Sequence, residues 1–308
     1  MENNDIVRRG LLEKIADFHS VPEGAYNIRE NSQSAGRRST DEIIIENKTD
    51  KPGINIIVKP GTKRKSVHIP VIITKTGITE MVYNDFIVGD DCDVLIVAGC
   101  GIHNTGDEAS AHDGVHHLEI GRNSRVKYIE KHYGEGNGSG ERIMNPEMTA
   151  NLADGAVLEV ESVQIGGIDS TNRKTVITCG KDCEVIMNER LMSDGHQNVM
   201  SDTEIILNGK GAKAQINSRS VAKGESTQVF YPKMTGNAEC FGHVQCDSII
   251  MDQAKVRSIP EISANDVDAR LIHEAAIGKI AGDQILKLMT LGMTAEEAEE
   301  RIIAGLLK

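Results

Sequence analysis

Cysteine thiols and histidine imidazoles are the side chains of this sequence best suited to bind sulfur or a transition metal. The segment 99–117, GCGIHNTGDEASAHDGVHH, combines one cysteine with four histidines, which are Cys100, His103, His112, His116 and His117. Thiolate and neutral imidazole are both ligands for soft or borderline metals. The segment therefore indicates either a metal or persulfide site or, alternatively, histidines on a solvated strand edge.

A second group of reactive residues lies near the carboxyl terminus. Cys246 occurs in VQCDSI, and His273 and Glu274 occur in IHEAAIGKI. A nearby cation or donor such as histidine lowers the pKa of a thiol and makes it reactive. Adjacent residues of a strand point to opposite faces, so His273 and Glu274 share one site only if the strand ends or bends between them. The other cysteines lack zinc-finger spacing and are expected to be reduced core residues: Cys92, Cys179, Cys183 and Cys240.

A weak internal repeat between residues 89 and 241 indicates which elements position these side chains. Each copy has a turn, a small residue, any residue and an apolar residue, followed by a run that alternates like a half-buried strand. A single coil cannot cover its apolar face, whereas stacked coils can. The long, uneven repeat predicts a mainly β protein with a right-handed parallel β-helix (β-solenoid) core, in preference to a β-sandwich. The small residues recur every 26 to 32 positions, at Cys92, Ser124, Ala156, Cys183, Ala212 and Ala238.

Short helices are predicted at both ends of the chain. Near the amino terminus Val7, Leu11, Ile15 and Phe18 share one helical face. The chain is then polar and irregular up to Thr40. The expected organisation is an amino-terminal helix and irregular segment over residues 1–40, a β-helix core over 41–272 and a helical region over 273–308.

The carboxy-terminal region carries two helical signals. Gly292 is a stop for the first helix, and Thr294 with Glu297 forms a capping-box pattern for the second. Apolar residues at helical spacing either pack on their own domain or dock a partner. The candidate partner-binding residues are Ile285, Leu288, Met289, Ile302 and Leu306.

Composition argues against several functions. Acidic residues outnumber basic ones 46 to 34, so no nucleic acid is expected as a partner. The sequence has no apolar run of membrane-spanning length and no signal-peptide pattern, which predicts a cytoplasmic protein without a membrane partner. A polysaccharide-binding β-helix is disfavoured because the chain has no tryptophan and only 3% aromatic residues.

Several motifs resemble the SufB/SufD family of iron–sulfur cluster assembly scaffolds. They are QCDSII, the HEA motif of IHEAAIGKI, a GDQILKL helix start, AGC at Cys100 and the coil GRNSRVKY, and the likeness covers roughly residues 85–308. The resemblance implies a β-helix core and docking of a SufC-type ABC ATPase on the carboxy-terminal helices. The chain has no Walker A motif, so we expect a scaffold and not an enzyme, with ATP hydrolysis supplied by the partner.

The same resemblance implies roles for individual residues. Cys100 would accept sulfur from a cysteine desulfurase or from sulfide and pass it to Cys246, where a transient iron–sulfur cluster forms that the isolated protein need not hold. His273 and Glu274 would complete the cluster site. Because one chain carries Cys246, His273 and Glu274 together, we expect a homodimer in which the cysteine of one protomer meets the histidine of its mate. The alternative within the family is a SufD-like accessory subunit that binds no cluster.

Overall fold

Two long β-sheets form most of the protein in a computed structural model that describes residues 2–16 and 23–307. Each sheet contains 11 strands among the described residues. Sheet A consists of β1 (Ala25–Glu30), β2 (Gln33–Arg38), β5 (Lys63–His68), β6 (Val71–Ile73), β8 (Asp93–His103), β10 (Arg125–Glu135), β13 (Val157–Ile165), β15 (Glu184–Ser193), β17 (Lys213–Ala222), β19 (Phe241–Ile250) and β22 (Arg270–Gly278).

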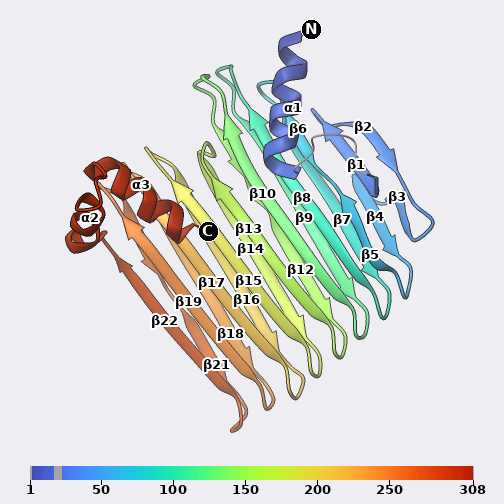
Figure 1. Cartoon of the computed structure of the whole chain (residues 1–308). Coiled ribbons are helices and arrows are strands. Elements are labelled where there is room, and N and C mark those ends of the chain that lie inside the picture. The colour runs from blue at the N-terminus through green and yellow to red at the C-terminus, as the bar shows by residue number, and fades with distance from the viewer. Residues whose placement is uncertain (1, 17–22, 308) are drawn as a thin grey trace.

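Sheet B faces sheet A across the core (Figure 1). It consists of β3 (Ile43–Asn47), β4 (Gly53–Val58), β7 (Thr79–Val88), β9 (Ser110–Ile120), β11 (Arg142–Met144), β12 (Glu147–Leu152), β14 (Ser170–Cys179), β16 (Asn198–Leu207), β18 (Thr227–Gly236), β20 (Lys255–Ser258) and β21 (Glu261–Ala264).

The chain winds alternately through the two sheets. In sheet A, β8 pairs in parallel with β10, β10 with β13 and so on to β22, while the strands between them in sequence pair in parallel in sheet B. The result is a β-solenoid of about 8 turns. The predicted parallel solenoid core is therefore confirmed, and each coil buries the apolar face of the next.

The predicted repeat is the turn that leads into each strand of sheet A. The sixth copy was misplaced by the pattern, because Phe241 pairs with Lys213 and therefore puts Cys240, not Ala238, in the repeat position. Both residues are small, and Ala238 lies within the turn while Cys240 ends it, so the sequence pattern did not distinguish them. The buried residues that occupy this position are Cys92, Ser124, Ala156, Cys183, Ala212 and Cys240.

The interior of the solenoid is divided lengthwise into an apolar and a polar half. Large apolar side chains such as Phe86 and Leu118 fill the half beside the repeat turns. In the other half, many inward positions of both sheets are buried yet polar, and small apolar clusters such as Leu191, Val199 and Phe230 lie between them. We call this half the polar track, and its members include Glu80, His112, His116, Glu130, His132, Ser162, Gln164, Thr171, Arg173, Glu189, Ser201 and Ser218.

An antiparallel pair closes the amino-terminal end of the solenoid. Residues 22–40 were predicted to be irregular, and this prediction is wrong for β1 and β2, which form a hairpin. Asn31 and Ser32 both have positive φ angles, of 49° and 64°, as a tight two-residue hairpin turn requires. The strands escaped notice because β2 is a polar edge strand without an apolar alternation.

Helix α1 (Glu2–Ala16) lies across the outer face of sheet A, over β8 and β10 (Figure 1). Leu11 and Ile15 are fully buried there, as predicted, whereas Phe18 lies outside the described residues. Two glycines on β8 allow this close packing, because a Cβ atom at Gly99 would lie 2.1 Å from the Ile15 carbonyl oxygen. The helix thus covers the outer side of the strand that carries Cys100 on its inner side.

Two helices follow the last strand at the carboxyl terminus, as predicted, but the boundary predicted at residue 273 is wrong because β22 continues to Gly278. They are α2 (Gly282–Met289) and α3 (Ala295–Leu306), and α3 contacts the outer face of sheet A at β17. The capping box is present, because Thr294 Oγ1 accepts a hydrogen bond from the Glu297 amide and the Glu297 carboxylate accepts one from the Thr294 amide.

Candidate functional site

Cys246 and His273 face the same side of two neighbouring strands at the open end of the solenoid. Cys246 lies on β19 directly opposite Ala275 of β22, and His273 is two residues from Ala275 on the inner face. This register places the two Cα atoms about 8 Å apart within one protomer. The structure therefore brings the thiol and the imidazole together without a second chain.

Glu274 is not part of this inner face. Strand β22 runs without interruption through His273 and Glu274, so the two side chains point to opposite sides of sheet A. Glu274 is exposed on the outer side, where its carboxylate lies 3.6 Å from the imidazole of His243. It can join a shared site with Cys246 only if β22 rearranges.

Two polar atoms around Cys246 have no partner within the described part of the chain. They are His273 Nε2 and the hydroxyl of Ser258, and both are buried. A buried polar atom left without a hydrogen bond costs about 1–3 kcal/mol, so such atoms often mark a place for water or a ligand. Burial is also the main cause that lowers the pKa of His273, which keeps its ring neutral and able to bind a metal.

The Cys246 thiol is in its protonated form at neutral pH. Burial raises its pKa to about 11, and the charges of Glu189 and Asp247 add to this rise. A thiol in this state is a poor nucleophile. A bound metal ion would replace the proton, since thiolate is the ligand form.

Cys100 lies inside the solenoid at the opposite end of the polar track. It is 6% exposed, faces His132 of the neighbouring strand β10, and packs in an apolar cluster with Val71 and Ile102. Burial, followed by the charges of Glu130 and Glu80, raises the pKa of its thiol well above the usual value. Five inter-strand steps separate β8 from β19, so Cys100 is about 24 Å from Cys246 along the axis.

Charged residues that the sequence analysis missed connect these two ends. Arg173 forms an ion pair with Glu130, donates to His132 Nδ1 over 3.2 Å, and lies 3.9 Å from a carboxylate oxygen of Glu189. All of these side chains are buried. The signal was present in the sequence, because Glu130 and Glu189 occupy the inward positions of alternating strands, where apolar residues are expected.

The four histidines of the segment 99–117 divide between the two faces of their strands. His112 and His116 are buried in the polar track, and His116 Nδ1 lies 2.6 Å from the Tyr128 hydroxyl. His103 and His117 lie on outer faces, where each pairs with a glutamate. The single site suggested by their proximity in sequence is therefore not formed, because alternation along the strands separates them.

No preformed metal centre is present in the described residues, in the sense that no three His, Cys, Asp or Glu side chains lie close enough to hold an ion. In the same part of the chain, neither α1 nor the carboxy-terminal helices combine the length and the apolar character needed to cross a bilayer. Cys246 and His273 are thus a pair of potential ligands that requires further donors from elsewhere.

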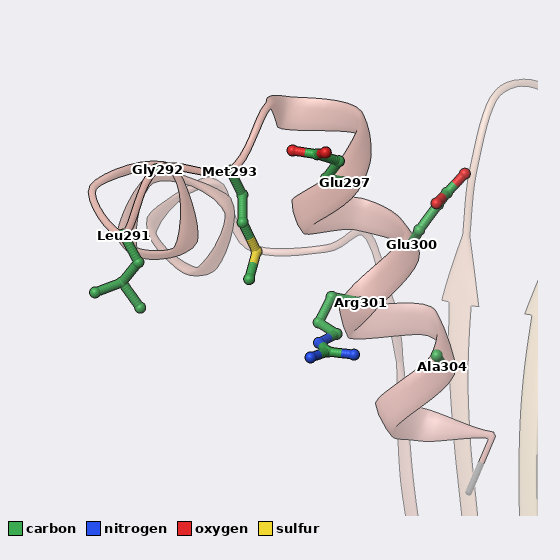
Figure 2. Close-up of a pocket in the computed structure, with 7 residues that line it drawn as sticks. All are labelled: Leu291, Gly292, Met293, Glu297, Glu300, Arg301 and Ala304. Carbon is green, nitrogen blue, oxygen red and sulfur yellow. The ribbon is translucent and has the colours of Figure 1, made fainter.

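The carboxy-terminal helices enclose a shallow hollow of about 570 Å³ (Figure 2). Leu291, Gly292 and Met293 of the connecting turn form one side, and Glu297, Glu300, Arg301 and Ala304 of α3 form the other. Of the predicted partner-binding residues, Met289 is 42% exposed and the other four are half-buried. The most exposed apolar side chains of α2, α3 and their connecting turn, Leu286 and Leu291, were not predicted.

Comparison with known proteins supports one family. Residues 72–306 match the family described as "SUF system FeS cluster assembly, SufBD core domain". An iron–sulfur cluster assembly SufBD family protein of Methanocaldococcus jannaschii is 28% identical and is matched over 96% of both chains. A SufBD family protein of Archaeoglobus fulgidus is 25% identical over 88% of this chain and 73% of its own length. One of Methanothermobacter thermautotrophicus is 24% identical over 83% of this chain and 62% of its own.

These matches leave no room for the polysaccharide-binding alternative. They cover the solenoid together with its carboxy-terminal helices, and thus include Cys100, Cys246 and His273. The chain belongs to the SufBD family of SUF-system iron–sulfur cluster assembly proteins.

Proposed function

We propose that this protein is a SufB-like scaffold on which an iron–sulfur cluster is assembled at Cys246 and His273. The observation that supports this most directly is their position on one inner face at the open end of the solenoid, where His273 Nε2 has no partner among the described residues. Thiolate and imidazole are both suitable iron ligands. Two protein ligands hold a cluster weakly, which suits a product that must be released.

A second copy of the chain is the proposed source of the remaining ligands. Among the described strands, β22 pairs only with β19, so its other edge is free, and Ile272 and Ile277 on it are 44% and 39% exposed. A two-fold pairing at this end would place a second Cys246 and His273 opposite the first. Mass photometry in the presence of the ATPase should then show a homodimer, and a population of monomers alone would contradict this.

We further propose that a SufC-type ABC ATPase docks on α2 and α3. The exposed leucines Leu286 and Leu291, together with Met289, give these helices an apolar surface that could bind in a hydrophobic groove of a partner. Leu286→Asp with Leu291→Asp should abolish co-purification of the ATPase. The matched control Ile262→Asp changes an equally apolar exposed residue on β21, away from the helices, and should leave docking unchanged.

Cys100 is the proposed entry point for sulfur from a desulfurase or from sulfide. Its separation of about 24 Å from Cys246 is too long for direct exchange between the two thiols. Sulfide would cross the interior as HS⁻ and bind iron at Cys246 without a change of oxidation state. Sulfur that a desulfurase delivers as a persulfide on Cys100 would first have to be released as HS⁻ by a second thiol, which forms a disulfide with Cys100. The polar track, which offers hydroxyl, amide and imidazole groups over this distance, supports such a route.

Anaerobic reconstitution with iron and sulfide tests the cluster assignment. The wild-type protein should acquire the visible absorption of an iron–sulfur cluster, and Cys246→Ser should lose it. Cys183→Ser is the matched control, because Cys183 is equally buried but its thiol donates to the backbone carbonyls of Leu152 and Ala153. A normal cluster on Cys246→Ser would refute the assignment, and a wild-type protein without any cluster would favour the SufD-like accessory role.

A further inference from the structure

The buried charges of the polar track do not balance. At one end Glu80 is paired with Arg29, through a 2.7 Å hydrogen bond from Arg29 Nε. Further along, the single Arg173 lies between two carboxylates, those of Glu130 and Glu189, and it is closer to Glu130. Among the described residues that face the interior, one negative charge is therefore left in excess, at Glu189.

The interior histidines do not supply the missing positive charge. Burial is the largest cause that lowers the pKa of His112 to about 3, that of His132 to about 4, and that of His116 in the same direction. All three rings are neutral at physiological pH. An uncompensated buried charge is unfavourable, so a cation near Glu189 would stabilise the interior.

Two serine hydroxyl groups hold the Glu189 carboxylate in place. Ser201 Oγ donates to Glu189 Oε1 and Ser218 Oγ donates to Glu189 Oε2, each over 2.8 Å. Both oxygens accept, and neither acts as a hydroxyl donor. Each oxygen retains a second lone pair that could coordinate a metal ion.

A small, partly open cavity adjoins this carboxylate. It has a volume of about 10 Å³, which is enough space for one water molecule or one ion. Glu189, Ser201, Thr203 and Ser218 line its polar side, and Cys246 lines it as well. Cys246 is 2% exposed and follows Ser218 in the same inward row of sheet A. The excess negative charge, the cavity and a thiol thus meet at one point.

We propose that this cavity binds a ferrous ion ahead of cluster assembly, with the Glu189 carboxylate as an oxygen ligand and the Cys246 thiolate as the sulfur ligand. The inference rests on the proposed role of Cys246 and adds to it a residue and a location within one protomer. An iron–sulfur bond forms, the thiol proton leaves to the buffer, and no electron is transferred. The two positive charges of the ion offset the thiolate and the carboxylate.

The donor set also explains why such an ion would be exchangeable. Carboxylate, thiolate and hydroxyl groups suit ferrous iron, but only two of them are ionised here. A site with two charged protein ligands holds its metal less tightly than a structural site with four. This is the behaviour expected of a loading site whose iron must move into a cluster.

Anaerobic titration of the metal-free full chain with Co²⁺, a spectroscopic stand-in for Fe²⁺, tests the inference. The wild-type protein should bind about one ion per protomer and develop a thiolate-to-cobalt charge-transfer band. Glu189→Gln, which removes the charge but keeps the shape, should weaken binding at least tenfold. Glu189→Asp keeps the charge but withdraws the oxygens, and should weaken it as well. Glu204→Gln, on the outer face of sheet B, is the matched control and should bind normally.

Three results would overturn the inference: wild-type affinity in Glu189→Gln, a charge-transfer band that persists in Cys246→Ser, or one ion per two protomers that is lost on dilution. Thermal melting of the metal-free proteins separates folding from binding, because Glu189→Gln removes an excess buried charge and should melt no lower than wild type. Cluster reconstitution of the same variants separates this inference from the proposed function. If a cluster forms at Cys246 but Co²⁺ binding does not depend on Glu189, only the inference is refuted. If a cluster forms on Cys246→Ser, the proposed function is refuted.

Discussion

Replacement of Arg173 by methionine should strongly destabilise the protein. Arg173 is 6% exposed, and its guanidinium is the only cation beside Glu130 and Glu189 among the described residues that face the interior. Arg173 is the largest favourable influence on Glu130, whose pKa is about 2 against an ordinary value of 4.5 even though burial acts in the opposite direction. That difference corresponds to about 3 kcal/mol of stability at pH 7. Removal of one partner from a buried ion pair typically costs about 3–5 kcal/mol, which agrees.

Urea unfolding at pH 7, followed by far-UV circular dichroism, measures this loss. Arg190→Met is the matched control, because Arg190 pairs with Glu161 over 3.0 Å on the partly exposed outer face of sheet A, and it should lose less than about 1 kcal/mol. The double variant Glu130→Gln/Arg173→Met should regain much of the stability, since the charge left unpaired beside Arg173 is removed. The reasoning fails if Arg173→Met is as stable as Arg190→Met, or if the double variant is no more stable than Arg173→Met.

Acid should remove the contribution of Glu130 to the stability of the folded protein. The folded-state pKa of Glu130 lies below its unfolded value, so its contribution is present above about pH 4.5 and is lost as the pH falls towards 2. The wild-type protein should lose this contribution in that window. Glu130→Gln/Arg173→Met should show a flatter stability profile there.

Three further substitutions test the buried histidines and the two ends of the solenoid. The wild-type protein should lose about 2 kcal/mol of stability between pH 7 and pH 5, because the buried His112 ring has a pKa of about 3 and stays neutral, while the unfolded ring takes up a proton below about 6.5. His112→Gln should reduce this loss. An unchanged dependence of the unfolding free energy on pH, measured in urea, would contradict the prediction. Gly99→Ala should detach α1 and expose it to limited proteolysis, since its Cβ would lie 2.1 Å from the Ile15 carbonyl oxygen, whereas Gly10→Ala, with open space around it, should leave α1 in place. Thr294→Ala removes the cap of α3 and should lower amide-exchange protection of that helix, by about 1 kcal/mol, without affecting the solenoid.

The coil repeat and the terminal helices could be predicted from the sequence because both depend on local periodicity. Turns followed by a small residue and an alternating run predicted the strands of sheet A, and apolar residues at helical spacing with a capping box predicted α3. The β1–β2 hairpin was missed since its strands are polar, and the last repeat was misplaced by two residues because its turn offered two small residues.

The choice of Cys100, Cys246, His273 and Glu274 as candidates came from motifs, but their arrangement depended on the register between strands. Register decided that Cys246 and His273 share an inner face, that Glu274 lies on the outer one, and that Cys100 is about 24 Å away. No local pattern contains this information, because strands that are neighbours in a solenoid are some thirty residues apart in the chain.

The sequence by itself determined the fold class, through a periodicity that every coil repeats, and it determined the family, through motifs near Cys100 and Cys246. Only the tertiary structure decided that Glu130, Arg173 and Glu189 meet inside the solenoid with one charge unbalanced. The physical reason is that burial and charge pairing are properties of neighbours in space, and the stacking of distant coils selects those neighbours.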